Sequence, residues 1–235
     1  MIDDAARMNT IFNFGDPHKD FKPVADLFLG QYQTEYLPIT NNKIFRVPEL
    51  QIVDAAYGPS MVLDSLTMMK QTGKLKQQDG VLFLGSMGSL SQNICLGDLV
   101  VPVEMHCTYF GFDNLLVYPD SEMYSKLCSL MQELGIDFKQ YVHGSVMAVF
   151  DPSTDHNAYT NCLYGKKVEG VDCCESYIGT KFCTENGIDS IALLYCSDDP
   201  NNHIANISKE EFDKKALETD LRMHRIAKDF FDIYQ

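Results

Sequence analysis

The sequence of 235 residues contains no tryptophan, only four arginines and no apolar run near the roughly 20 residues that a membrane-spanning helix needs. Acidic residues outnumber basic ones, with 33 Asp and Glu against 19 Lys and Arg, so the net charge is −14. A surface of this sign repels phosphate backbones and anionic lipid, and it argues against nucleic-acid and membrane partners. Because arginine is so scarce, an anion site in this chain has to depend on lysine, hydroxyl and backbone N–H groups.

The eight cysteines form no C-x-x-C pair and no regular framework. In a chain of this size, that pattern is typical of reduced, mostly buried thiols. The acidic start of the sequence, residues 1–4, lacks the basic region of a secretory signal peptide. We therefore expect a cytoplasmic protein. The carboxylates and histidines lack metal-ligand spacing, so no metal site is expected.

Apolar segments of strand length alternate along the chain with segments of helical period. Strands are predicted over residues 10–14, 51–57, 81–84, 99–103, 142–150 and 191–196, and helices over 21–29, 61–69, 121–134, 176–186 and 209–234. No linker or repeat divides the sequence, which predicts one domain over residues 1–235. The fold class is α/β, with a central mixed, mainly parallel sheet flanked by helices.

Glycine-rich and polar segments follow several of the predicted strands, which is where ligands bind in sheets of this kind. The segment GDP follows residue 14, GSMGS follows residue 84 and SDDP follows residue 196, while CCES opens the helix before that last strand. Each of these, taken alone, is consistent with an ordinary turn or helix cap. Their combination and order carry the functional information.

Taken in order, GDP, GSMGSL…GDLVVP, CCES and LLYCSDDP resemble the motifs of the nucleoside phosphorylase/nucleosidase superfamily, from about residue 10 to residue 200. The sharpest part of the resemblance is the spacing of 23 residues between Glu175 and Asp198, which matches the family's distance between its ribose-binding Glu and its purine-facing Asp. The resemblance implies a one-domain α/β fold, a nucleoside or nucleotide as small-molecule partner, no cofactor, and a homo-oligomer such as a dimer or hexamer.

The resemblance also implies roles for individual residues. Asp198 hydrogen-bonds or protonates the departing purine, a role for which burial at a strand end would raise its pKa. Glu175 accepts hydrogen bonds from the ribose hydroxyls, and Cys174 replaces a common family methionine beneath the sugar. Phe150 and Ser197 are candidates to contact the base, although core packing explains Phe150 equally well. The histidines at positions 106, 143 and 203 are expected to be structural or surface residues.

The nucleophile stays open between phosphate and water. Phosphorylases of the family carry an arginine four residues after the glycine of the GDP turn and another just before the glycine-serine turn, and these positions hold Lys19 and Phe83 here. Lysine retains the charge but loses bidentate geometry, and Phe83 offers nothing to phosphate. Gly15 and Ser86 remain able to offer a backbone N–H and a hydroxyl, so the expected phosphate site is Gly15, Lys19 and Ser86.

Hydrolytic relatives provide two further comparisons. Methylthioadenosine nucleosidases carry a water-orienting carboxylate where Lys19 stands, and AMP nucleosidases need no arginine at position 83. Because Lys19 is not a carboxylate, the sequence favours phosphorolysis of a purine nucleoside to ribose 1-phosphate in purine salvage, with inorganic phosphate as co-substrate. Hydrolysis is the alternative, and a non-catalytic nucleoside-binding module is a minor one. Whether Lys43 or Arg46 serves a neighbouring subunit's site is left open.

Overall fold

The computed structural model describes residues 7–14, 22–55, 58–108, 115–146, 168–172, 174–198 and 209–234. The strands are β1 (Asn9–Phe14), β2 (Gln33–Tyr36), β3 (Lys43–Arg46), β4 (Leu50–Ala55), β5 (Gly80–Ser89), β6 (Leu99–Thr108), β7 (Leu115–Val117), β8 (Lys139–Val146), β9 (Gly170–Asp172) and β10 (Asp189–Asp198). The helices are α1 (Lys22–Leu29), α2 (Pro59–Gln71), α3 (Ser121–Glu133), α5 (Glu175–Glu185) and α6 (Lys209–Ile233).

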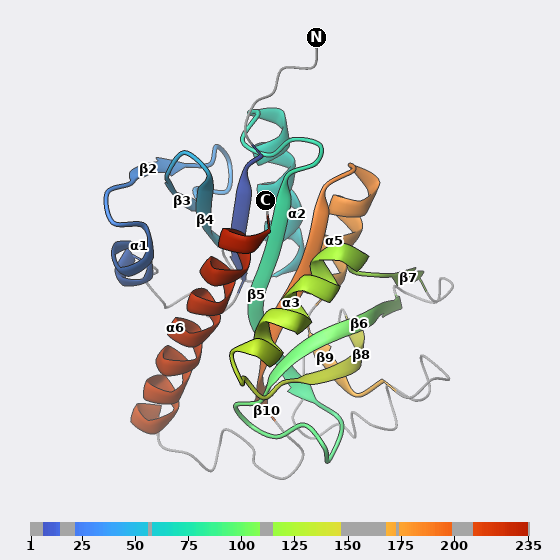
Figure 1. The fold of residues 1–235 in the computed structure, drawn as a ribbon. Coiled ribbons are helices and arrows are strands. Elements are labelled where there is room, and N and C mark those ends of the chain that lie inside the picture. The colour runs from blue at the N-terminus through green and yellow to red at the C-terminus, as the bar shows by residue number, and fades with distance from the viewer. Residues whose placement is uncertain are drawn as a thin grey trace.

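Helices cover both faces of the sheet (Figure 1). Helices α1, α3 and α6 pack on one face and α2 and α5 on the other, each through an apolar side. Strand β10 shows why both faces are covered, because its side chains alternate between the two cores: Ile191 and Leu193 enter one, and Ala192 and Leu194 enter the other. The predicted α/β class with a mixed sheet is confirmed.

The sheet combines an open half with a closed half. Its open half runs in the order β5-β1-β4-β3-β2, with parallel pairs in the centre and antiparallel pairs at the edge. Strand β10 pairs with both β5 and β6, so β5, β10, β6, β8 and β9 close into a ring. Gly170 is needed in this ring, since a Cβ there would overlap the side chains of Met87 and Tyr141.

The glycine-serine segment is strand rather than turn, so the predicted end of this strand at Leu84 is wrong. Strand β5 continues through Ser89, and its second half pairs with both β10 and β9. Gly85 allows this continuation because a Cβ there would overlap the ring and carbonyl group of Phe14 on β1. The four short strands β2, β3, β7 and β9 are also absent from the sequence-based prediction.

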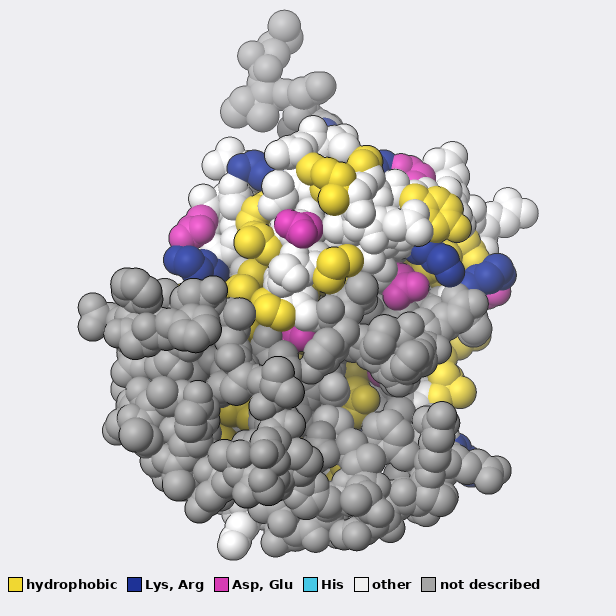
Figure 2. Space-filling view, turned by 180° about the vertical axis from the view of Figure 1, so that it is seen from behind, with side chains coloured by type: hydrophobic (Ala, Val, Ile, Leu, Met, Phe, Trp, Pro, Cys, Tyr) yellow, Lys and Arg dark blue, Asp and Glu magenta, His cyan; other side chains and the backbone are white. Residues whose placement is uncertain are grey.

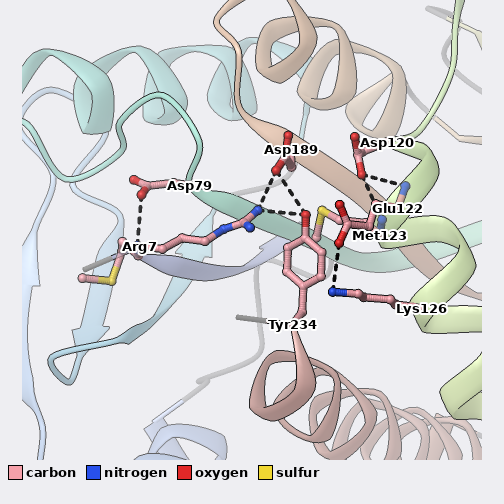
Figure 3. Close-up of polar contacts among 9 residues, drawn as sticks. Arg7, Asp79, Asp120, Glu122, Met123, Lys126, Asp189 and Tyr234 are labelled. Atoms are coloured by element: carbon pink, nitrogen blue, oxygen red, sulfur yellow. Dashed lines mark hydrogen bonds and ion pairs between the residues drawn. The ribbon is translucent and has the colours of Figure 1, made fainter. Parts of the chain in front are cut away.

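A polar cluster, here called the N-terminal clasp, lies where the central strands begin (Figure 3). It consists of Arg7, Asp189 and Tyr234. The guanidinium of Arg7 donates to Asp189 Oδ2 at 2.6 Å and to the Tyr234 hydroxyl at 2.9 Å, and it lies 4.2 Å from the centre of the Tyr234 ring. The clasp therefore ties the segment before β1 and the end of α6 to the start of β10.

Hydrophobic side chains are spread in separate groups over the described part of the rear face, which α2 and α5 cover (Figure 2). The exposed Leu63 belongs to α2. Scattered apolar side chains are ordinary on protein surfaces, so the expected homo-oligomer stays a prediction.

Among the helices that the structure describes, none is both long and apolar enough to cross a membrane. The six cysteines within the described ranges are all free thiols.

Candidate functional site

The register of the ring brings the segments of Glu175 and Asp198 to one edge of the sheet. Asp198 pairs with Gly88 of β5, and Gly88 pairs on its other side with Val171 of β9. Because adjacent strands are about 4.8 Å apart, the backbones of Asp198 and Val171 lie roughly 10 Å apart. Glu175 follows Val171 by four residues. The structure describes only the backbone of Asp198, so the direction of its carboxyl group stays a prediction.

Glu175 is the first residue of α5 and is buried, with 1% of its surface exposed. The preceding residue, Cys174, has a φ of 76°, a left-handed backbone conformation that residues other than glycine rarely adopt. This backbone conformation turns the chain from β9 into the helix. The result is a carboxylate at the positive end of a helix dipole, inside the protein and next to the edge where Asp198 lies.

Asp172 holds this turn in place. Its Oδ1 accepts a hydrogen bond from Cys174 N–H and its Oδ2 accepts one from Ser176 N–H, both at 2.9 Å. Burial opposes ionisation of Asp172, but the charge and hydrogen bond of His143 and the donors of Ser176 outweigh burial and hold its pKa at about 2. Asp172 is thus an ionised carboxylate in the interior.

Two further side chains lie behind Asp172. His143 Nε2 is 3.1 Å from Asp172 Oδ1, and His143 Nδ1 is 2.5 Å from the hydroxyl of Tyr141. Tyr141 and His143 are two residues apart in β8, so both side chains point to the same side of the strand. Burial raises the pKa of Tyr141 well above its usual value, which keeps its hydroxyl protonated.

Cys174 faces the core rather than open space. Its Sγ lies 3.8 Å from the Sγ of Cys107 on β6, and its side chain is fully buried. The hydrogen bond with Cys107, together with burial, raises the pKa of the Cys174 thiol. Cys174 is therefore a protonated thiol beside Glu175, and its predicted contact with a ribose stays a prediction.

The two predicted serines lie on β5 and β10, which pair with each other in the ring. Ser86 is half-buried on β5, opposite Tyr195 of β10. Ser197 lies on β10, where its hydroxyl donates to the carbonyl of Met87 at 3.3 Å. Three other predicted site residues, Gly15, Lys19 and Phe150, lie outside the described residues.

Phe83 lies within the apolar core on the α2 and α5 side of the sheet. It is fully buried, its ring centre is 5.5 Å from that of Phe12 and 6.1 Å from that of Phe14, and a Cβ at Gly179 of α5 would overlap it. Position 83 is thus closed on all of these sides by apolar groups. A charged side chain at this position would have to be buried among them at a high energetic cost.

Lys43 and Arg46, the two basic residues considered for a neighbouring subunit's site, lie at opposite ends of β3. Lys43 is opposite Asp54, one residue before the end of β4, whereas Arg46 is opposite Gln51 near the beginning of that strand. Lys43 is therefore the one of this pair that approaches the edge where the parallel strands end. Among the described residues, no group of three or more His, Cys, Asp or Glu side chains is placed to hold a metal ion.

The sequence matches the model of the phosphorylase superfamily over residues 59–232, about three-quarters of its length. The chain belongs to this superfamily. The resemblance predicted from the motifs is confirmed, and the matched residues include Ser86, Glu175 and Asp198. The GDP segment with Gly15 and Lys19 lies before the matched part. No curated protein sequence matches the chain.

Solved structures of the phosphorylase superfamily share the fold. Futalosine hydrolase of Helicobacter pylori superposes with a TM-score of 0.74 at 16% identity, covering 96% of this chain and 98% of that one. The 5′-methylthioadenosine/S-adenosylhomocysteine nucleosidase of Campylobacter jejuni gives 0.74 at 12% identity, with 96% and 98% covered. A nucleosidase assigned to the same class from Francisella philomiragia gives 0.72 at 17%, with 96% and 100% covered. At these identities the likeness establishes the fold alone.

Sequence reasoning missed Asp172 and Tyr141 and assigned His143 a structural role. A signal was present in Tyr141 and His143, whose spacing of two predicts a shared face on a strand. Nothing local connects that pair with Asp172, because the contact depends on the pairing of β8 with β9. The phosphorylase superfamily member therefore carries a buried polar network next to Glu175 that its motifs do not reveal.

Proposed function

We propose that this phosphorylase superfamily member is a nucleosidase that cleaves the N-glycosidic bond of a purine nucleoside with water as the nucleophile. The observation that carries the proposal is the burial of Phe83 at the position where phosphorylases have an arginine. An apolar ring enclosed by Phe12 and Phe14 contributes no guanidinium to a phosphate. Lys19 favours phosphorolysis in the sequence, but one lysine replaces the bidentate geometry of an arginine poorly.

The fold neighbours support the same choice. The Helicobacter pylori protein is named a hydrolase, and those of Campylobacter jejuni and Francisella philomiragia are named nucleosidases. The names hydrolase and nucleosidase both describe enzymes that use water to cleave a bond, which in a nucleosidase is the N-glycosidic bond. We therefore place hydrolysis before phosphorolysis for this chain, and we take the purine class of substrate from the family resemblance at Asp198.

The proposed reaction gives Asp198 and Glu175 distinct tasks. As the C–N bond to the base breaks, the ribose becomes oxocarbenium-like and the base gains negative charge. Asp198 hydrogen-bonds or protonates the departing base, and Glu175 holds the sugar through its hydroxyls. The water oxygen bonds to the anomeric carbon as the C–N bond breaks. One proton of the water stays on the new anomeric hydroxyl, and the other passes to the departing base or replaces the proton that Asp198 has given to it. The products are free purine and free ribose.

The test is base release from purified protein in phosphate-free buffer and after addition of phosphate. The substrates are adenosine, inosine, AMP, 5′-methylthioadenosine and futalosine, and free base is measured by chromatography. We expect release without phosphate from at least one of them, with the oxygen of ¹⁸O-labelled water recovered in the sugar. Release that requires phosphate and yields ribose 1-phosphate would show phosphorolysis instead. Absence of release from every substrate would leave a non-catalytic binding module.

A further inference from the structure

The buried network around Asp172 is built around one residue. The two backbone N–H groups that Asp172 binds belong to Cys174 and Ser176, which directly precede and follow Glu175. Cys174, at the N-cap position of α5, makes no side-chain hydrogen bond to the helix. Asp172 therefore supplies the cap from two residues upstream, and in doing so it fixes the backbone on both sides of Glu175.

The cap is more elaborate than a helix start requires. Helix α3 begins with Asp120, whose Oδ1 accepts hydrogen bonds from the N–H groups of Glu122 and Met123, at 3.0 and 2.9 Å. Asp120 is only half-buried. A single side-chain oxygen of this kind is enough to cap a helix. Asp172 instead lies in the interior with His143 against it, although removing two such groups from water is energetically costly.

The contacts among Asp172, His143 and Tyr141 are compatible with one another and hold these side chains in place. Both oxygens of Asp172 are engaged by backbone donors, and one of them also contacts His143. The hydroxyl of Tyr141 can donate to a neutral His143 or accept from a charged one, so the chain of contacts persists in either state. Tyr141 and His143 are among the most buried residues, which leaves their side chains little freedom.

We propose that Asp172 is a positioning residue, backed by His143 and Tyr141, that sets the backbone turn carrying Glu175 and so aims its carboxylate at the ribose hydroxyls. The inference rests on the proposed function. Recognition of a hydroxyl needs its acceptor placed within a fraction of an ångström, and misplacement by about 1 Å can cost roughly 100-fold in rate. The network provides that precision at a turn whose left-handed residue would otherwise be strained.

The decisive variant is Asp172→Asn, with Asp120→Asn as its matched control. Each oxygen of Asp172 accepts a backbone N–H, so an amide must turn its NH₂ toward one of these donors. At Asp120 a single oxygen accepts both bonds, and asparagine preserves it. We expect kcat/KM for a ribonucleoside to fall roughly 10- to 100-fold in Asp172→Asn, mainly through KM, and to stay unchanged in Asp120→Asn.

The readout that separates positioning from general damage is substrate selectivity. If Asp172 acts through Glu175, then Asp172→Asn loses much less activity on nucleosides lacking the 2′- or 3′-hydroxyl than on the parent ribonucleoside. Equal losses on all substrates, or full activity in Asp172→Asn, would overturn the proposal. Thermal unfolding establishes that each variant is folded. Should Asp172→Asn not fold, Tyr141→Phe decides, with the same selective loss expected and unchanged selectivity counting against the proposal.

Failure of the proposed function can be told apart from failure of this inference. If wild-type protein releases no base, calorimetric binding of adenosine and its deoxy analogues replaces the kinetic comparison. Binding that discriminates the hydroxyls in wild type but not in Asp172→Asn would support positioning and overturn only catalysis. Wild-type protein that neither cleaves nor binds these nucleosides would overturn both.

Discussion

Strand β10 begins with Asp189 and ends with Asp198, and the two ends of this strand have different surroundings. At its beginning, Asp189 is about one-third exposed and is paired with Arg7 and Tyr234 in the N-terminal clasp. At its end, the neighbouring segment carries Asp172 and Glu175, which are both almost completely buried. At the beginning of β10 the carboxylate of Asp189 is thus paired with Arg7, and near its end the carboxylate of Asp172 is paired with the buried imidazole of His143.

The two ends of β10 contribute differently to stability and to activity. Ion pairs near the surface add little stability and tolerate change, so the N-terminal clasp has the character of a fastening between chain ends. Buried carboxylates are costly, and groups of this kind cluster at sites where their charge and position are used. The comparison predicts that substitutions at the beginning of β10 lower stability modestly and leave activity unchanged, whereas substitutions near its end lower activity.

The largest expected effect is on turnover. Asp198→Asn removes the proposed proton donor and should lower base release by at least about 100-fold while the thermal midpoint changes little. Asp189→Asn, at the other end of the same strand, should lower the thermal midpoint and leave base release unchanged. Base release by chromatography and unfolding by circular dichroism measure the two. Near-normal activity of Asp198→Asn would remove Asp198 from the mechanism.

Acid affects the two regions differently, because the pKa values of their buried carboxyl groups are shifted in opposite directions. The pKa of Asp172 is lowered to about 2, so its ionised form stabilises the fold above the unfolded pKa of about 4, and this contribution is lost as the pH falls toward 2. Burial raises the pKa of Asp79, which binds the N–H of Met8 beside Arg7, so protonation of Asp79 favours the folded state as the pH falls.

Urea unfolding between pH 7 and pH 3 measures these two signs. The free energy of unfolding of wild type should exceed that of Asp172→Asn by roughly 2–3 kcal/mol at neutral pH, and the difference should shrink in acid. The corresponding difference between wild type and Asp79→Asn should instead change in favour of wild type as the pH falls. Parallel changes in the two variants would contradict the opposite pKa shifts.

The smallest effect is expected in the N-terminal clasp itself. Arg7→Met keeps the apolar stem but removes the ion pair with Asp189 and the contact with the Tyr234 ring. Because these groups are partly exposed, the loss should be about 1 kcal/mol of unfolding free energy, with kcat/KM unchanged. Lys126→Met, whose ammonium lies 4.8 Å from the centre of the same ring, should cost less. A fall in kcat/KM of Arg7→Met would break the division between the two regions.

Local pattern accounts for the elements that the sequence predicted well. The continuous apolar run 191–196 forms the centre of β10, and the apolar period of 121–134 forms α3, which ends just before Gly135 in a left-handed conformation. Short elements escaped prediction because they lack a period of their own. Strand β9 has three residues and exists through its pairing with β5 and β8.

In the candidate site, the sequence alone was sufficient to propose Glu175 and Asp198 and to recognise the family, because their spacing can be read directly from the chain. Short motifs and the periodicity of hydrophobic residues can be recognised in the sequence without knowledge of the tertiary structure. Tertiary structure decided that Gly88 lies between the two segments, that Phe83 is enclosed by apolar rings, and that His143 supports Asp172. These facts depend on which distant strands pair and in which register, and the energy that fixes the register comes from burial in a core shared by the whole fold.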